Sequence, residues 1–395
     1  MPLILRRVAI ALAWLASVLV STVAAAPTAN QPSAELATKA RQAILIDVAS
    51  GAILYRKASE DRVPPASMTK LMTLNLLFKA IDAGKVGRTE EVTMSVDAWR
   101  RGGAPSGSSA MFVPVNTKVT IDELIQGIIV QSGNDAAIAV AERLAGSEPK
   151  FAALMNEEAK RIGMTATNFV NATGLHHPEH LSTARDLATL AQHMISAHAK
   201  YYPLFAQREF NYRKHKFINR NPLLALSIGV DGMKTGQVRE SGFGLVASAV
   251  QDGRRLLLVI HGCETAQERR DEAQRLLEWG FKSFAEARLY DPGEVVGEAR
   301  VYGGTRLYVP LVGADGVRVL LLRSPANPRL KAELVYKRPL KAPIRKGDQI
   351  ARLRVTGTTS AVNEVPLYAA EDVDVGPVWR RGLDSLAHLA LGWVR

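Results

Sequence analysis

Three short groups of polar residues in this sequence have types and spacings that suit acyl-transfer chemistry. The first is Ser67 and Lys70, in a segment followed by the apolar residues 71–81. The apolar run predicts a buried helix that ends near Gly84, which places the serine at the helix N-terminus and the lysine one turn along the same face. The serine hydroxyl would face unpaired backbone N–H groups, and a buried amine could accept its proton. The alternative is an N-cap serine beside a lysine that extends to solvent.

The second group lies at a break in a helical pattern. Residues 121–145 have helical periodicity that is interrupted at residues 131–135, where Ser132 and Asn134 flank a glycine. The glycine allows a sharp turn, so that both polar side chains can point the same way. Small polar residues that cap two successive helices would explain the same pattern.

The third group is the run Lys234, Thr235 and Gly236 in a strand-like segment. The ammonium supplies positive charge, the hydroxyl can bind an oxyanion, and the glycine would let a substrate backbone lie against the strand edge. The alternative is a lysine that protects an edge strand from aggregation.

The elements around these groups predict an α+β fold. Strands from both ends of the region enclose a helical middle, which is the plan of an antiparallel sheet with an inserted helical subdomain. The expected elements are hairpins over 43–55 and 242–260, helices over about 150–161, 184–197 and 265–283, and an irregular segment over 87–118.

The composition changes after about residue 288. Short strand-like runs alternate with turn residues there and predict a small all-β domain. Residues 377–395 place Trp379 and Trp393 on an apolar helical face opposite several arginines, which suits a helix lying in a membrane interface. Docking onto the β domain or a partner protein is the alternative. We therefore expect a signal peptide over 1–26, a catalytic domain over 27–288, an all-β domain over 289–376 and an amphipathic anchor over 377–395.

Composition and the N-terminus indicate an exported globular protein. The 395 residues are 47% hydrophobic and 22% charged, enough for more than one folded domain. Arg6 and Arg7, the apolar residues 8–20 and a small-residue site at 23–25 predict a cleaved signal peptide, because a spanning helix needs about 20 apolar residues. The net charge of +12 favours lipid headgroups or wall polymer, and without a recognised binding module we expect no nucleic acid partner.

Two further features have less specific interpretations. Cys263 is the single cysteine, so it cannot form an internal disulfide and is expected to pack in the core. Residues 174–180 hold three histidines and a glutamate, which are residue types that bind zinc. They have no fixed spacing on a helix or strand, so we expect a solvated, pH-responsive loop, no metal and no cofactor.

Taken together, the three groups resemble those of the exported D-alanyl-D-alanine carboxypeptidases, the low-molecular-mass penicillin-binding proteins. The resemblance runs from about residue 35 to 288, and the β domain and final helix also match the family's layout. It implies a DD-peptidase/β-lactamase-like domain before the all-β domain. The matching motifs are residues 65–70, 131–137, 171–175 and 230–236.

The resemblance also implies a role for each matching residue. Ser67 would attack the carbonyl between two D-alanines of a peptidoglycan stem peptide, would form an acyl-enzyme, and would be acylated by β-lactams. Lys70 would be its base, Ser132 would relay a proton to the leaving D-alanine, and Asn134 would hold the substrate amide. Substrate binding would fall to Lys234, Thr235, Gly236, Gln237, Arg269 and Arg220.

Within that last set the expected tasks differ. Lys234 and Thr235 would bind the terminal carboxylate, and like-charge repulsion from this group would keep Lys70 partly neutral. The backbone N–H groups of Ser67 and Gln237 would form the oxyanion hole. Two arginines, Arg269 and Arg220, are candidates for the carboxylate, with a surface salt bridge as the alternative for each. The family often has histidine where this chain has Gln237.

The resemblance leaves other functions to weigh. A β-lactamase is disfavoured because the chain lacks a Glu-x-x-Leu-Asn segment of the class A type. A DD-endopeptidase would use the same residues on peptidoglycan cross-links, and a non-catalytic wall-binding protein would retain an idle site. The family's location would be the periplasmic face of the inner membrane, with peripheral membrane contact through residues 377–395.

Overall fold

The computed structural model describes residues 36–239, 241–323, 330–356 and 362–379. The predicted signal peptide and residues 380–395 of the predicted anchor lie outside this part of the chain. Within it, no helix combines the length and the apolar character needed to cross a membrane.

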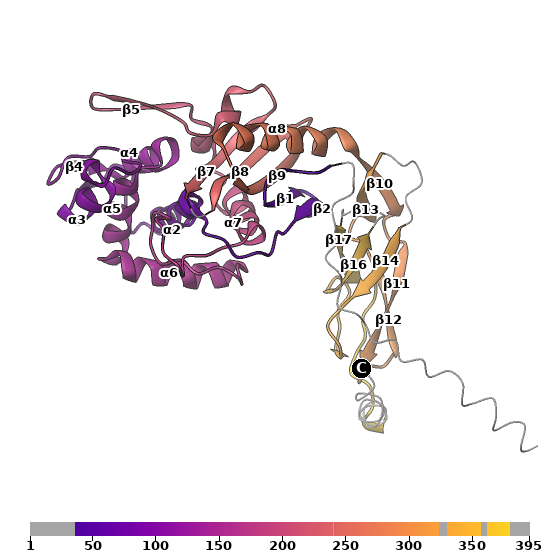
Figure 1. Cartoon of the computed structure of the whole chain (residues 1–395). Coiled ribbons are helices and arrows are strands. Elements are labelled where there is room, and N and C mark those ends of the chain that lie inside the picture. The colour runs from indigo at the N-terminus through magenta and orange to yellow at the C-terminus, as the bar shows by residue number, and fades with distance from the viewer. Residues whose placement is uncertain (1–35, 240, 324–329, 357–361, 380–395) are drawn as a thin grey trace, which may run out of the picture. The chain divides into compact units, whose positions relative to one another are not determined.

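An antiparallel sheet forms the centre of the N-terminal region (Figure 1). Its strands lie in the order β2-β1-β9-β8-β7. The hairpin between β8 and β9 turns at Asp252 and Gly253, which both have positive φ, as a tight two-residue turn requires. Strand β7 carries the Lys234 group and ends this order. The bounds are β1 (Gln42–Asp47), β2 (Ile53–Lys57), β7 (Val230–Val238), β8 (Gly242–Gln251) and β9 (Arg254–Cys263).

Successive residues of the strands point to opposite faces and enter two separate cores. Ile44 belongs to the core shared with the helical subdomain, whereas Leu45 belongs to the core beneath α8 (Ala266–Ser283). The buried helix predicted after Ser67 is α2 (Lys70–Asp82). The predicted α+β fold is confirmed. The remaining helices are α4 (Ile121–Gln126), α5 (Asn134–Ala145), α6 (Glu148–Ile162) and α7 (Ala184–Ala197), with a π-helical turn at Gly127–Gln131.

The segment 87–118 is more regular than predicted. It contains β3 (Glu91–Thr93), α3 (Val96–Gly102) and β4 (Lys118–Thr120). Helix α3 starts where the Ser95 hydroxyl accepts a hydrogen bond from the Ala98 N–H, so a capping residue stabilises a helix too short to show periodicity. A hairpin of β5 (Glu209–Tyr212) and β6 (His215–Ile218) was also not expected.

The C-terminal region is built from short strands around a core of its own. Strand β10 spans the predicted domain boundary at residue 288 and pairs with β13. The bounds are β10 (Phe284–Tyr290), β11 (Val295–Tyr302), β12 (Tyr308–Val312), β13 (Val317–Leu322), β14 (Lys331–Val335), β15 (Leu340–Lys341), β16 (Gln349–Thr356) and β17 (Val362–Ala369).

Candidate active site

Ser67 lies in a 3₁₀ turn, Ala66–Thr69, immediately before α2 begins at Lys70. The Lys70 side chain is fully buried, and its Nζ lies 2.9 Å from the Ser67 hydroxyl and 2.7 Å from the Thr173 carbonyl oxygen. The serine therefore precedes the α-helix instead of lying within its first turn, and the 3₁₀ turn still brings the two side chains together.

A glycine opposite the serine turn makes this approach possible. Gly174 has a φ of +82°, and a Cβ at this position would lie 1.8 Å from the Ala66 carbonyl oxygen. Any side chain would therefore push residues 171–175 away from the turn that holds Ser67, and Thr173 would move with them.

The surroundings of Lys70 favour its neutral form. Burial and, to a smaller extent, the positive charge of Arg220 lower its pKa to about 7, whereas Asp135 and Glu148 oppose the shift. A large fraction of the amine is therefore unprotonated near neutral pH. A neutral amine can donate one hydrogen to the Thr173 carbonyl and still accept the proton of the Ser67 hydroxyl.

The bend between α4 and α5 orients the second group. Ser132 has a left-handed backbone (φ 64°), and its buried hydroxyl has no hydrogen-bond partner. The Asn134 side-chain N–H donates to the Ser108 hydroxyl at 2.8 Å, while its carbonyl oxygen is buried and unpaired. Buried polar atoms normally have partners, so these two atoms are available to a substrate.

Lys234 and Thr235 are buried on β7. Burial lowers the pKa of Lys234 well below its usual value, and repulsion from Lys70, Arg220 and Arg269 adds to this shift. The sequence led us to expect the charge of Lys234 to keep Lys70 neutral, but the main charge doing so is that of Arg220.

The structure gives Gly236 a packing role beside the predicted one, which stays a prediction. The residue is buried, and a Cβ there would come within 3.0 Å of the Pro65 carbonyl oxygen and 3.2 Å of Ala66. The glycine therefore allows β7 to pack closely against the turn that carries Ser67. Gln237 is the next residue and its side chain is exposed.

The two arginines occupy different places. Arg220 donates to the Ser109 hydroxyl at 2.8 Å and lines the cavity beside Ser67. Arg269 is not among the residues that line this cavity. Its guanidinium lies 5.7 Å from the centre of the Phe243 ring, and its buried Nε has no hydrogen-bond partner among the described residues. Burial lowers the pKa of both groups. Neither arginine has a carboxylate within ion-pair distance in the described part of the chain, so the surface salt bridge considered for each is absent there.

These residues surround a cavity of about 410 Å³. Behind its wall lie the buried side chains of Lys70, Ser132 and Lys234. The cavity is lined by Ser67, Gly107, Ser108, Ser109, Asn134, Thr173, Gly174, Leu175, Arg220, Gln237 and Val238.

The histidine loop, residues 174–180, was predicted to be solvated, but part of it is buried. His180 is buried: its Nδ1 accepts the Val170 N–H, so its Nε2 carries the hydrogen and donates to the Thr69 hydroxyl at 2.8 Å. Burial lowers the pKa of His180 to about 4, so the ring stays neutral near pH 7. Among the described residues, no cluster of three or more histidine, cysteine or acidic side chains could hold a metal ion. Cys263 is buried in the core, as expected.

Sequence reasoning missed the contribution of the Thr173 main chain and of Asp135. The buried Asp135 carboxylate accepts the N–H groups of Met111 and Val113, which fixes the loop that carries Ser108. Asp135 directly follows Asn134, so its place in the motif was the available signal. The carbonyl of Thr173 leaves no such signal, because every residue has one.

Comparison with known proteins agrees with this geometry. The family described as "D-alanyl-D-alanine carboxypeptidase" matches residues 26–265, and "Penicillin-binding protein 5, C-terminal domain" matches residues 284–375. The D-alanyl-D-alanine carboxypeptidase DacC of Escherichia coli (strain K12) is 37% identical over 91% of this chain and 90% of its own length. DacA of Haemophilus influenzae is 38% identical over 78% of this chain and 79% of its own length.

A solved structure gives the same result. The crystal structure of penicillin-binding protein 5 from Haemophilus influenzae matches with a TM-score of 0.70 and 34% identity, over 88% of this chain and all of that one.

Proposed function

Because the chain belongs to the D-alanyl-D-alanine carboxypeptidase family, we propose that it removes the terminal D-alanine from peptidoglycan pentapeptides through an acyl-enzyme on Ser67, and that β-lactams acylate the same serine. The observation that carries this proposal is the buried Lys70 amine, which lies 2.9 Å from the Ser67 hydroxyl at the wall of an open cavity. An amine that is neutral in part at pH 7 is suited to activate a hydroxyl.

The acylation step follows from this arrangement. The Ser67 oxygen attacks the carbonyl carbon of the D-alanyl-D-alanine bond while its proton passes to Lys70. The proton then reaches the nitrogen of the departing D-alanine through the Ser132 hydroxyl, which has no other partner. Water hydrolyses the resulting ester and restores the serine. The backbone N–H groups of Ser67 and Gln237 are the proposed donors to the oxyanion.

The unpaired cations account for the preference for a free carboxylate. In the described part of the chain, no carboxylate lies within ion-pair distance of Lys234, Arg220 or Arg269. A terminal carboxylate bound by Lys234 and Thr235, beside Arg220, would supply the missing negative charge, while Arg269 acts through its field. A substrate without that carboxylate would leave these charges uncompensated.

The same proposal assigns the substrate a place beside β7. Among the described residues β7 is the last strand in the order of the central sheet, so a peptide can add beside it as a further strand. Asn134 would then hold the peptide amide from the opposite side of the cavity, with its unpaired carbonyl oxygen.

Release of D-alanine tests the proposal. We expect the purified protein to release D-alanine from a pentapeptide muropeptide and to leave cross-linked dimers intact, because the buried cations select a free terminal carboxylate. The two substrates are compared at equal concentration by chromatography of the products. Cleavage of dimers at a rate equal to that of pentapeptides would instead assign an endopeptidase.

We further propose an exported protein on the periplasmic face of the inner membrane, with the domain boundaries predicted above and peripheral contact through residues 377–395. Two observations support a membrane contact at this end. The last described residues, Val378 and Trp379, are 80% and 67% exposed, and the helical pattern that follows places Trp393 on the same face as Trp379.

Deletion of residues 377–395 is expected to release the protein from membranes while its activity on soluble substrate is unchanged, because the deletion removes no residue of the cavity. Co-sedimentation with anionic lipid vesicles measures the effect. In the full chain, Leu389→Asp alters the apolar face and should weaken binding, whereas the control Leu391→Asp lies outside that face. Equal sedimentation of the full-length and truncated proteins would refute the anchor.

A further inference from the structure

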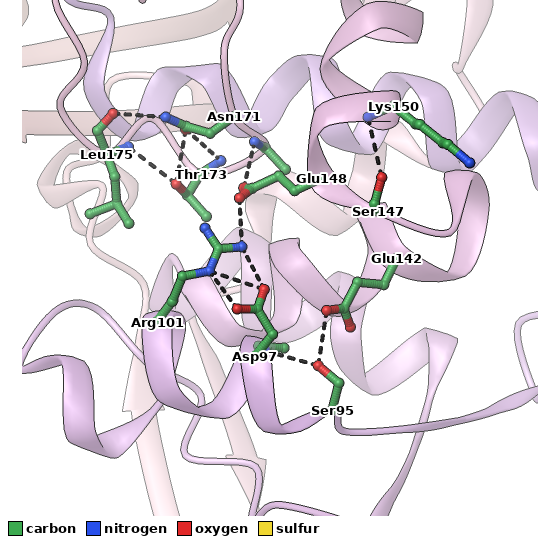
Figure 2. A network of polar contacts seen from close by, with 12 residues as sticks. Ser95, Asp97, Arg101, Glu142, Ser147, Glu148, Lys150, Asn171, Thr173 and Leu175 are labelled. Atoms are coloured by element: carbon green, nitrogen blue, oxygen red, sulfur yellow. Dashed lines mark hydrogen bonds and ion pairs between the residues drawn. The ribbon is translucent and has the colours of Figure 1, made fainter.

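A chain of polar contacts runs from one wall of the cavity to helix α3, which packs against the other wall (Figure 2). One wall is the turn over residues 171–175, whose Thr173 carbonyl holds the Lys70 amine. The other is the bend that carries Ser132 and Asn134. The polar contacts run from the turn through Glu148 to Arg101 on α3, and the end of α3 packs against the bend.

The turn over 171–175 is held from the outside by Glu148. The turn has its own support from Asn171, whose side-chain oxygen accepts the Thr173 and Gly174 N–H groups at 3.1 and 2.7 Å. Its main chain is then tied to α6, because the Ala172 N–H donates to the Glu148 carboxylate at 2.9 Å. Glu148 is the first residue of α6 and its side chain is only 7% exposed.

Arg101 links this carboxylate to α3. Its guanidinium lies 2.8 Å from the second Glu148 oxygen and is held in turn by both oxygens of Asp97, at 2.7 to 3.0 Å. The other end of α3 is fixed to α5, where the Ser95 hydroxyl donates to Glu142 at 2.9 Å. The contact of Arg101 with Glu148 and that of Ser95 with Glu142 together fix the position of α3.

The end of α3 also touches the opposite wall. A Cβ on Gly102, the residue after Arg101, would lie 2.4 Å from the Asp135 nitrogen and 2.5 Å from the Asn134 carbonyl carbon. The helix end thus lies directly against the backbone of the bend. A displacement of α3 would therefore move Asn134 directly and Thr173 through Glu148.

We propose that the Arg101–Glu148 ion pair is a positioning element for the acylation of Ser67. It fixes the turn over 171–175 against α3. The Thr173 carbonyl then holds the Lys70 amine beside the Ser67 hydroxyl, and the distance between this turn and the opposite wall of the cavity stays constant. This inference rests on the proposed mechanism and deepens it. Reacting groups misplaced by about 1 Å can lose about 100-fold in rate, so a contact remote from the chemistry can matter.

Glu148 also acts on Lys70 through its charge, as one member of a set. Arg220 lowers the pKa of the amine, whereas Glu148 raises it. The charged and titratable groups that act on Lys70 or respond to its charge are Arg220, Asp135, Glu148, Lys234 and His180. Removing the Glu148 charge would therefore favour the neutral amine. Arg101 is not one of these groups, so its removal acts on the position of the turn and not on the pKa of Lys70.

The test is the rate of Ser67 acylation by benzylpenicillin as a function of pH, in Glu148→Gln and Arg101→Gln. Above the pKa of Lys70 we expect both variants to react about tenfold more slowly than the wild type, because the turn is less well fixed. The acid limb of the profile, where the rate falls as Lys70 gains a proton, should move down by about half a pH unit in Glu148→Gln and stay in place in Arg101→Gln. Arg101→Lys keeps the charge but loses the two-pronged contact with Asp97, so its rate should fall while its acid limb stays.

Glu158→Gln is the matched control. Glu158 is on the same helix, is as buried as Glu148 and pairs with Arg161, yet it contacts Asn75 and Lys79 of α2 and not the turn. The melting temperature of each variant is measured as well. It distinguishes a variant that has lost stability from one in which only the position of the turn has changed. An acid limb that does not move in Glu148→Gln, or rate losses that Glu158→Gln reproduces, would overturn the proposal.

The same samples distinguish this inference from the function on which it rests. Wild-type protein that is acylated by benzylpenicillin but releases no D-alanine from pentapeptide would contradict the carboxypeptidase function and leave the positioning role standing. Normal D-alanine release by the wild type together with an unmoved acid limb in Glu148→Gln would contradict only the positioning role.

Discussion

Replacing Ser67 by alanine is expected to abolish covalent labelling by benzylpenicillin and release of D-alanine together. The Ser67 hydroxyl is the nucleophile beside Lys70 at the wall of the cavity, and an alanine methyl group can form no ester. Intact mass spectrometry after exposure to penicillin should show one adduct on the wild-type protein and none on the variant. No residual slow labelling is expected, because the covalent route itself is lost.

The matched control for this change is Ser196→Ala. Ser196 is on α7, and its hydroxyl bonds only to carbonyl groups of its own helix, Gln192 and His193. The same loss of one hydroxyl oxygen there should leave the adduct intact. Adducts on both the wild type and Ser67→Ala, or on neither, would show that Ser67 is not the nucleophile.

Replacing Lys70 by alanine should slow acylation by about 1,000-fold, the usual worth of a well-placed general base. The pH profile gives the sharper result. Burial lowers the pKa of Lys70 to about 7, so in the wild type the amine gains a proton, and the acylation rate falls, as the pH drops below that value. Lys70→Ala has no such group, so its slower rate should lack this inflection.

Lys79→Ala provides the comparison for this prediction. Lys79 is on the same helix, is half-exposed and pairs with Glu158, which keeps Arg161 as a partner. Its removal should change neither the rate nor the inflection. A wild-type rate that stays constant below pH 7, or an inflection that persists in Lys70→Ala, would assign the base to another group.

The sequence predicted the framework of the fold well because hydrophobic periodicity and turn residues define long elements. Helix α7 was expected over 184–197 and has those bounds. Elements without such signals were missed. Helix α3 is too short for a periodic pattern, and no strand was predicted over β10.

The residues of the site divide in the same way, into those that a local sequence pattern marks and those that it does not. Ser67, Lys70, Ser132 and Asn134 were found because each belongs to a group of unusual residue types at short spacing. The role of Arg220 in lowering the pKa of Lys70 was not foreseen, because it depends on the folding of a distant loop. The ion pair of Arg101 and Glu148 joins two helices that are 47 positions apart (148 − 101) and that no local pattern relates.

The acceptor that holds Lys70 belongs to the main chain, and this bears on how the protein can evolve under antibiotics. A side-chain acceptor disappears with one base change, whereas any codon at position 173 still encodes a peptide carbonyl. Selection for weaker acylation therefore has no direct route to this contact through residue 173. It must act on the neighbours that shape the turn, such as Asn171 or Gly174, where each change also risks the physiological reaction.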